Sequence, residues 1–304
     1  MHDHRSIAED LPLMRAGGVT AKVFQVGLDV EIGQTFAASV SKTKGWTKRT
    51  LVSMEEAIRV IEEHKDVATL ALTASDIERA KESGKIAILL GVEGGKLLEG
   101  ELSLLQTFHR LGLRELQLTW AVPNQLVKEG RLTSFGKDVV TECARLGLIV
   151  DVTHIPDRAF CEVMEVAEKP VIISHGAARA VNTDLDDKHI KAIAHTGGVI
   201  GIHFYSTYLG SPPTVSAVCD HVAYITDLVG IDHVGLGIDF FPSKGAWRNL
   251  QLAQGTKDIS WAIPDLGSMP LVTEALTKRG FKDQDVQKVI GLNFLRVCRD
   301  VFGR

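Results

Sequence analysis

Short apolar runs recur along the chain with little polar alternation inside them. Runs of this kind are typical of parallel strands that are covered on both faces. Seven of them predict strands, at residues 22–28, 85–95, 115–120, 148–154, 170–176, 197–204 and 232–240. The pattern therefore indicates a largely parallel sheet that is buried between other elements.

Amphipathic segments separate these apolar runs. Their apolar residues recur at helical spacing, and several begin with Ser or Asp as an N-cap and close with Gly. They cover residues 53–66, 74–84, 102–112, 134–147, 157–168, 186–197 and 216–230. Strands that alternate with helices at this spacing predict an α/β fold with right-handed crossovers.

A TIM-type (β/α)8 barrel is the simplest fold for this order of elements, but it uses eight strands where seven are predicted. The segment before the first run, residues 6–18, predicts a helix or a loop. We therefore expect a barrel that lacks its first strand or has it truncated, with the missing strand before Met1. A doubly wound nucleotide-binding fold is disfavoured, because no GxGxxG or GxxxxGK[ST] follows an early strand.

Length and composition fit one globular domain. The chain has 304 residues, of which 45% are hydrophobic and 24% charged, with a formal net charge of −4. Barrels reach this length as one domain, so we expect a single domain over residues 1–304 with a long loop at 242–268 after the last strand. The chain contains no basic stretch of the kind that would predict a nucleic-acid partner.

Neither a signal peptide nor a membrane span is predicted. The first ten residues contain no apolar h-region, and no apolar run approaches the roughly 20 residues that a span requires. Four widely spaced cysteines, Cys143, Cys161, Cys219 and Cys298, are predicted to be reduced and buried. We therefore expect a cytoplasmic protein.

Chemically active residues stand at the ends of the apolar runs, where barrels carry their active sites. These residues are Glu93, Trp120, His154, His175, His203 and Asp239. Two histidines and a carboxylate from separate strands match a three-ligand zinc-type site with an open position for water. A histidine at a strand end can equally be structural, and we expect this of His203, which has no acidic partner nearby in the sequence.

Glu93, His154 and His175 are accordingly the predicted metal ligands. The carboxylate of Glu93, in GVEGG, is costly to bury without a cation or hydrogen-bond donors. A metal lowers the pKa of a bound water toward about 7, and Asp239 could then take its proton. No GxSxG motif and no cysteine at a strand end supports a different nucleophile.

Several motifs occur together in the order found in one family of zinc peptidases. They are DLPLMRAGGV, GVEGG, LTSFGKDVV with LGLIVDVTH, PVIISH, VGLGIDF and GLNFLRV. In them the chain resembles the membrane (renal) dipeptidase family, peptidase family M19, within the amidohydrolase-like barrels. The resemblance implies that Glu93 bridges two zinc ions, that His154 and His175 hold the second zinc, and that Asp239 moves protons. It also places Tyr208 near the substrate.

The chain departs from this family at three places. The family's HxD motif, which supplies ligands of the other zinc, would precede Met1, and His2 and His4 are expected to be solvated. One zinc site is therefore expected, since a second would need ligands absent from this chain. Trp120 replaces a histidine that polarises the substrate carbonyl, and Arg179 is the remaining candidate for binding the substrate carboxylate.

These features predict a metal-dependent hydrolase of the membrane-dipeptidase type that cleaves a dipeptide or a related small amide. The alternative is a catalytically degenerate or one-metal barrel with an altered substrate or a binding role. Trp120 would favour an apolar or aromatic group in the substrate. Trp247 and Trp261, in the long loop, are candidates for a lid, a subunit contact or a local plug, and the resemblance implies a possible homodimer.

Overall fold

Eight parallel strands form one curled sheet in the computed structural model, which describes residues 7–29, 45–120, 122–182, 184–241, 249, 251–252 and 255–303. Seven strands follow one path of pairing. In path order they are β1 (Ala21–Leu28), β3 (Ile86–Glu93), β4 (Leu113–Gln117), β7 (Ile149–Asp151), β8 (Val171–Gly176), β9 (Ile200–Ile202) and β10 (Val234–Leu236). All seven predicted strands are confirmed, although most are shorter than their apolar runs.

The eighth strand, β2 (Ala68–Leu70), was not predicted. It pairs with the first half of β3, whereas β4 pairs with the second half from Leu90 onward. Since β1 occupies the other edge of β3, β2 and β4 share one edge in succession. Within the described residues no strand joins β10 to β1, so the path has two ends.

Helices surround the sheet. All seven predicted helices are confirmed, namely α2 (Trp46–Glu63), α3 (Ala74–Glu82), α4 (Leu102–Arg110), α5 (Ser134–Leu146), α6 (Asp157–Val166), α7 (Asp187–His195) and α9 (Val215–Val229). The segment before the first strand forms α1 (Ile7–Ala16). The side chains that cap helices α3, α5 and α9 are those of Thr73, Thr133 and Thr214, rather than the expected Ser or Asp.

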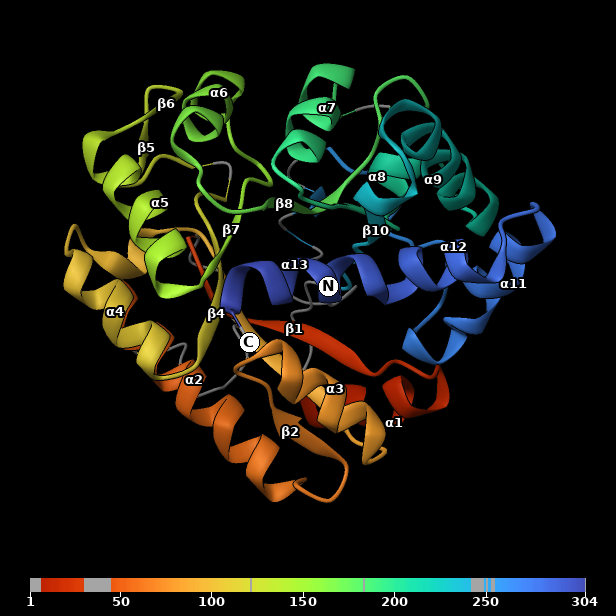
Figure 1. Cartoon of the computed structure of the whole chain (residues 1–304), viewed down its shortest axis with the longest axis horizontal. Coiled ribbons are helices and arrows are strands. Elements are labelled where there is room, and N and C mark those ends of the chain that lie inside the picture. Colours follow the sequence, from red (N-terminus) through yellow and green to blue (C-terminus); the bar gives the residue numbers. More distant parts are fainter. Residues whose placement is uncertain are drawn as a thin grey trace.

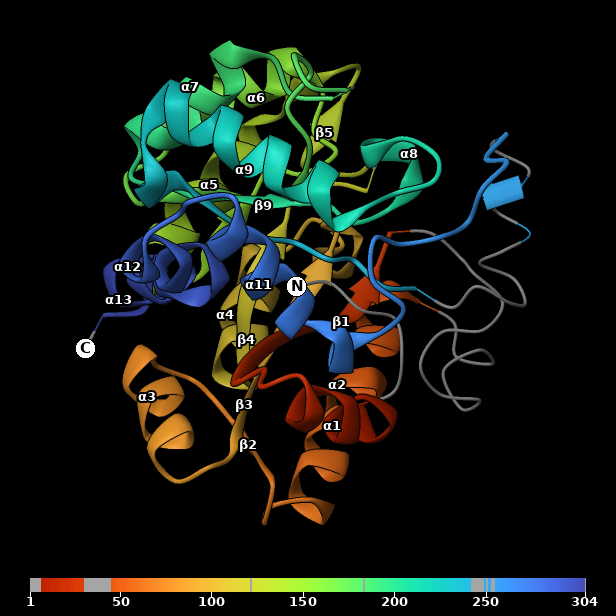
Figure 2. The same cartoon turned by 90° about the vertical axis from the view of Figure 1, so that its right-hand side faces the viewer.

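The remaining elements are short or lie near the C-terminus. They are the hairpin β5 (Val127–Lys128) and β6 (Arg131–Leu132), and the helices α8 (Ser206–Leu209), α11 (Pro270–Lys278), α12 (Asp283–Gln287) and α13 (Asn293–Phe302). Figure 1 shows α13 crossing the middle of the ring of helices. In the side view, α12 and α13 lie toward one end of the sheet and α8, which closely follows β9, toward the other (Figure 2).

Alternate residues of β3 face two different hydrophobic clusters. Ile88, Leu90 and Val92 belong to the larger cluster, which includes residues of the surrounding helices. Ala87 and Leu89 belong to a smaller cluster that includes residues of α13. Both faces of the strand are therefore covered, which explains why its sequence shows no polar alternation. Packing on both faces fixes the carboxyl end of β3, where Glu93 lies.

Some predicted features fall wholly or partly outside the described residues. Part of the predicted loop 242–268, including Trp247, lies outside the described residues, as do His2 and His4. Trp261 is described, and its indole nitrogen donates to the carbonyl oxygen of Asp239 at 3.0 Å. Trp261 therefore supports the strand end that carries Asp239.

All four cysteines are free, and the prediction that all are buried is wrong for one of them. Cys143, Cys219 and Cys298 are buried, but Cys161 is exposed on α6. The helical pattern around Cys161 left open which face of the helix it occupies. None of the helices in the described ranges combines the length and apolar character needed to cross a membrane.

Candidate metal centre and active site

The predicted strand-end residues converge at one edge of the sheet, with Trp120 packed against His154. Glu93 is the last residue of β3, His175 lies in β8, and His203 follows β9 directly. His154 and Asp239 each follow the end of a strand by three residues, with φ values of 64° and 52°. Left-handed backbone at residues other than glycine is costly and is concentrated at functional sites.

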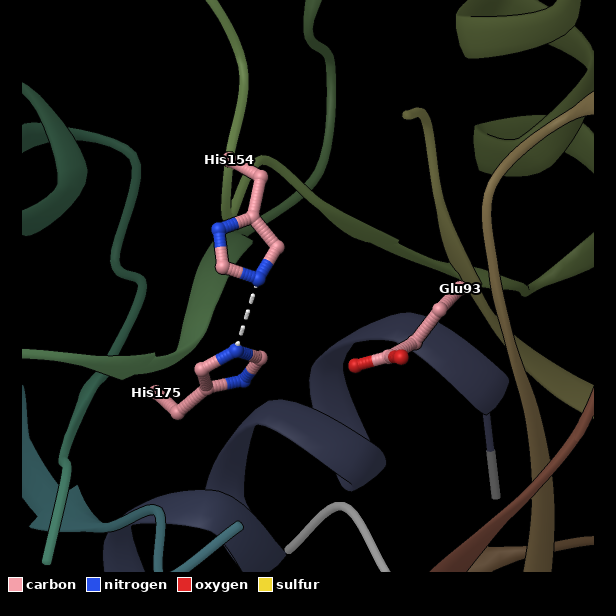
Figure 3. Close-up of side chains that lie close together, drawn as sticks. All are labelled: Glu93, His154 and His175. Carbon is pink, nitrogen blue, oxygen red and sulfur yellow. Dashed lines mark hydrogen bonds between the residues drawn. The ribbon is translucent and has the colours of Figure 1, made fainter. Parts of the chain in front are cut away.

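Glu93, His154 and His175 form the predicted metal-binding group. Figure 3 shows their side chains pointing toward one another, and their donor atoms lie within 4.8 Å of each other. The two Nε2 atoms of His154 and His175 are 3.1 Å apart. Tetrahedral zinc with bonds of about 2.0–2.1 Å would separate two nitrogen ligands by roughly 3.3 Å. The arrangement therefore fits a cation between the two rings.

The Nδ1 atom of His175 is held by a network of hydroxyls. Ser174 Oγ lies 2.6 Å from Asp151 Oδ2, and Thr153 Oγ1 lies 2.6 Å from Asp151 Oδ1. Because carboxylate oxygens accept, both hydroxyls donate to Asp151. Ser174 Oγ, 3.0 Å from His175 Nδ1, then accepts the hydrogen of that nitrogen. This tautomer directs the lone pair of His175 Nε2 toward the metal-binding group.

The second ligand histidine is kept neutral by its surroundings. Burial lowers the pKa of His154 below its usual value, although the nearby carboxylates of Glu93 and Asp239 act in the opposite direction. A neutral imidazole is the form that binds a metal. The ring of Trp120 packs edge-on against His154, with 6.1 Å between ring centroids. Trp120, which the sequence proposes as a substrate-binding residue, thus borders the candidate metal-binding group.

Asp239 is buried beside the metal-binding group and contacts a histidine that we expected to be structural. Its Oδ2 lies 3.9 Å from His175 Nε2 and 3.1 Å from His203 Nε2. His175, His203 and Asp239 form a second group of three possible metal ligands. His203 ends its apolar run just as His175 does, but its acidic partner lies on the next strand and is not visible in the local sequence.

The predicted substrate-binding residues differ in their placement. Tyr208 stacks on His203 with 4.2 Å between ring centroids, and burial raises the pKa of its hydroxyl. It lines a cavity together with His154 and His175. The side chain of Arg179 is 58% exposed and binds Asp186 at 2.8 Å. The structure therefore brings Tyr208 to the site and leaves Arg179 engaged away from it.

The cavity beside the ligands has a volume of about 100 Å³. Its lining includes three groups that the sequence did not single out: Asp157, Asp184 and His189. Asp184 Oδ2 accepts a hydrogen bond from the backbone N–H of Ala177 at 3.1 Å, and burial raises the pKa of this carboxyl group. None of the described residues that line this cavity is a lysine or an arginine.

Comparison with known proteins identifies the family. The family model for membrane dipeptidase, peptidase family M19, matches residues 1–302. The chain is 34% identical over 259 residues to dipeptidase tcpJ of Claviceps purpurea (strain 20.1), an alignment that covers 80% of this chain. It covers 57% of that protein, so the chain spans little more than half the length of this curated relative.

Solved structures confirm the barrel-type fold. An amidohydrolase from Pseudomonas aeruginosa is 26% identical with a TM-score of 0.88, covering 100% of this chain and 96% of that one. A metallopeptidase from Rhodobacter sphaeroides, solved with a phosphinate mimic of the dipeptide L-Ala-D-Ala, has a TM-score of 0.79 at 21% identity. That alignment covers 96% of this chain and 90% of the other. The chain therefore belongs to the membrane dipeptidase family, peptidase family M19.

Proposed function

We propose that this protein is a metal-dependent hydrolase that cleaves the amide bond of a dipeptide or a related small amide. One observation carries the proposal: Glu93, His154 and His175 converge on one point beside a cavity, with Nε2 of His175 presented as a lone-pair donor. Membership of a dipeptidase family and the identity with a fungal dipeptidase support the reaction class.

Glu93, His154 and His175 would hold one zinc ion. A carboxylate and two imidazoles are a donor set that suits zinc and leaves a coordination position open. When bound, such an ion supplies Lewis acidity, which lowers the pKa of water toward about 7 and polarises a carbonyl group. The second donor group shares His175 with the first, and a single Nε2 lone pair serves one cation.

Asp239 would move the proton during hydrolysis. Its carboxylate lies beside the ligands but is not one of the three, and Oδ2 is held by contact with His203. When water attacks the amide carbon, Oδ2 accepts the proton that the water loses. The same oxygen then delivers the proton to the nitrogen of the leaving amine, so that the amide C–N bond breaks without forming an amide anion.

Trp120 and Tyr208 would border the substrate on either side of the ligand histidines. Trp120 contacts His154, and Tyr208 stacks on His203 and lines the cavity. Arg179 is paired with Asp186, so we do not expect it to bind the substrate carboxylate. The lining contains the carboxyl groups of Asp157 and Asp184, but Asp157 pairs with Lys188 and burial raises the pKa of Asp184, so we expect only a modest preference for substrates without a free carboxylate. Values of kcat/KM for a panel of dipeptides and their C-terminal amides test this preference. Higher values for the dipeptides with a free carboxylate would contradict it.

The proposed function is tested by replacing Asp239 in zinc-loaded protein. Asp239→Asn should retain zinc and lower kcat for dipeptide hydrolysis by roughly 10²–10⁴-fold, the usual contribution of a general acid–base group. Asp227→Asn, on the exposed face of α9, is the matched control and should hydrolyse normally. A wild-type kcat in Asp239→Asn would show that Asp239 does not transfer the proton. Wild-type protein that takes up no stoichiometric metal would favour a degenerate barrel with a binding role.

A further inference from the structure

His203 lies beside both Asp239 and the candidate metal ligand His175. It is 1% exposed, its ring stacks on Tyr208, and it meets His175 edge-on with 5.2 Å between ring centroids. Its Nε2 lies 3.1 Å from Asp239 Oδ2. By donor atoms alone, His203 qualifies as a ligand of a second cation with His175 and Asp239.

The hydrogen bond on the other side of the ring decides between these roles. The backbone N–H of Tyr205 donates to Nδ1 of His203 at 3.1 Å. A backbone N–H can only donate, so Nδ1 must carry a lone pair. The ring hydrogen of His203 therefore resides on Nε2, which faces Asp239. A nitrogen that bears a hydrogen has no lone pair to offer a metal.

His175 shows the opposite arrangement one strand away. Its Nδ1 donates to Ser174 Oγ, which leaves the Nε2 lone pair for a cation. Two buried neighbouring histidines are thus fixed in different tautomers, one by a side-chain acceptor and one by a backbone donor. The two donor groups that overlap at His175 are therefore not equivalent.

We propose that His203 is a positioning residue for Asp239 and not a metal ligand. Its Nε2–H donates to Asp239 Oδ2 and fixes the orientation of the carboxylate that handles the proton in the proposed hydrolysis. The group of His175, His203 and Asp239 then does not bind a second cation. This inference rests on the proposed function for the role of Asp239, whereas the tautomer of His203 is independent of activity.

The tautomer is measured directly by long-range ¹H–¹⁵N correlation on protein labelled with ¹⁵N-histidine, with and without zinc. We expect His203 to show a protonated Nε2 and an unprotonated Nδ1 in both samples, and its signals are assigned by their loss in His203→Gln. Protonation at Nδ1, or loss of the Nε2 hydrogen of His203 when zinc is added, would overturn the inference. A protein without hydrolase activity would instead refute the proposed function and leave this result standing.

Two substitutions separate positioning from metal binding. His203→Leu removes the donor, whereas His203→Gln keeps an N–H group near the position of Nε2. We expect both variants to retain wild-type zinc stoichiometry, while kcat falls about 10–100-fold in His203→Leu and less in His203→Gln, with KM little changed. Loss of zinc in the folded variants would identify His203 as a ligand, and a wild-type kcat in His203→Leu would exclude positioning. His233→Gln, at the amino end of β10, is the control and should match wild type.

Discussion

The two ends of the sheet bury charged groups in different ways. At the amino end of β1, the ammonium group of Lys22 forms an ion pair with Asp10 of α1, and both side chains are 0% exposed. At the carboxyl ends of the strands, the carboxylates of Glu93 and Asp239 lie beside the imidazoles of His154, His175 and His203. The first arrangement pairs two opposite charges directly, whereas the second gathers carboxylate oxygens and imidazole nitrogens, a donor set that suits a cation. In TIM-type barrels, residues at the amino-terminal ends of the strands contribute to stability, whereas catalytic residues lie at the carboxyl-terminal ends.

The largest effect is expected when one of the candidate metal ligands is removed. His175→Ala removes one of three ligands, so zinc binding should be lost and dipeptide hydrolysis should fall by roughly 10³-fold or more. Elemental analysis and steady-state kinetics on the same preparation measure both effects. Retention of stoichiometric zinc by this variant would show that the cation is held elsewhere.

Breaking the ion pair at the other end should affect stability instead of chemistry. Lys22→Ala leaves Asp10 as a buried charge without its ammonium partner, which typically costs about 3–5 kcal/mol of unfolding free energy. Urea denaturation measures this loss, and the Lys22→Met/Asp10→Leu double variant should recover most of it. The comparison fails if folded Lys22→Ala protein binds less zinc than wild type.

A smaller effect is expected from the hydroxyl that orients His175. Ser174→Ala removes the acceptor of the His175 Nδ1 hydrogen, and the loss of such a supporting contact typically weakens metal binding by about 10–100-fold. Ser174→Thr keeps the hydroxyl and should bind zinc more tightly than Ser174→Ala. Competition with a chromogenic chelator gives the affinities, and equal affinities for wild type and Ser174→Ala would rule out this role.

The last expected effect appears only at acidic pH and concerns a buried histidine outside the cluster. His221 accepts a hydrogen bond from the backbone N–H of Ala178 through Nδ1, and burial lowers its pKa to about 4. The unfolded chain therefore binds this proton at higher pH than the folded protein does. The stabilisation is complete above about pH 6.5, the usual value, and is lost as the pH falls toward 4.

Thermal unfolding across this range tests the role of His221. The matched variant His221→Asn offers an acceptor to Ala178 but does not titrate. Its melting temperature should fall less than that of wild type as the pH drops from 6.5 to about 4. Parallel curves for the two proteins would assign the acid sensitivity to other groups.

Strand positions and the ligand group could be predicted because each left a local signal. Glu93 and His175 end uninterrupted apolar runs, and His154 follows one closely, so their convergence follows from parallel pairing. Strand β2 has only three residues and no detectable period. Strand β2 forms where the first half of β3 has an edge that β4 does not pair with.

Other features depend on contacts that only the folded chain makes. The proposed role of His203 depends on Asp239, which follows the neighbouring strand β10, and on a backbone N–H two residues after His203, and a residue pattern reveals neither contact. Arg179 was proposed from its position after His175, but its partner Asp186 lies in the same connection and engages it. Residue type and order thus predicted which possible donors lie together, whereas the tertiary hydrogen bonds on which we base their proposed roles could not be predicted.

Anomalous diffraction at the zinc edge, from crystals grown with zinc, tests the central claim most directly. We predict one strong peak at about 2.0–2.2 Å from a Glu93 oxygen and from Nε2 of both His154 and His175, with no peak bonded to His203. A peak coordinated by His203 and Asp239, or no peak beside Glu93, would contradict the account.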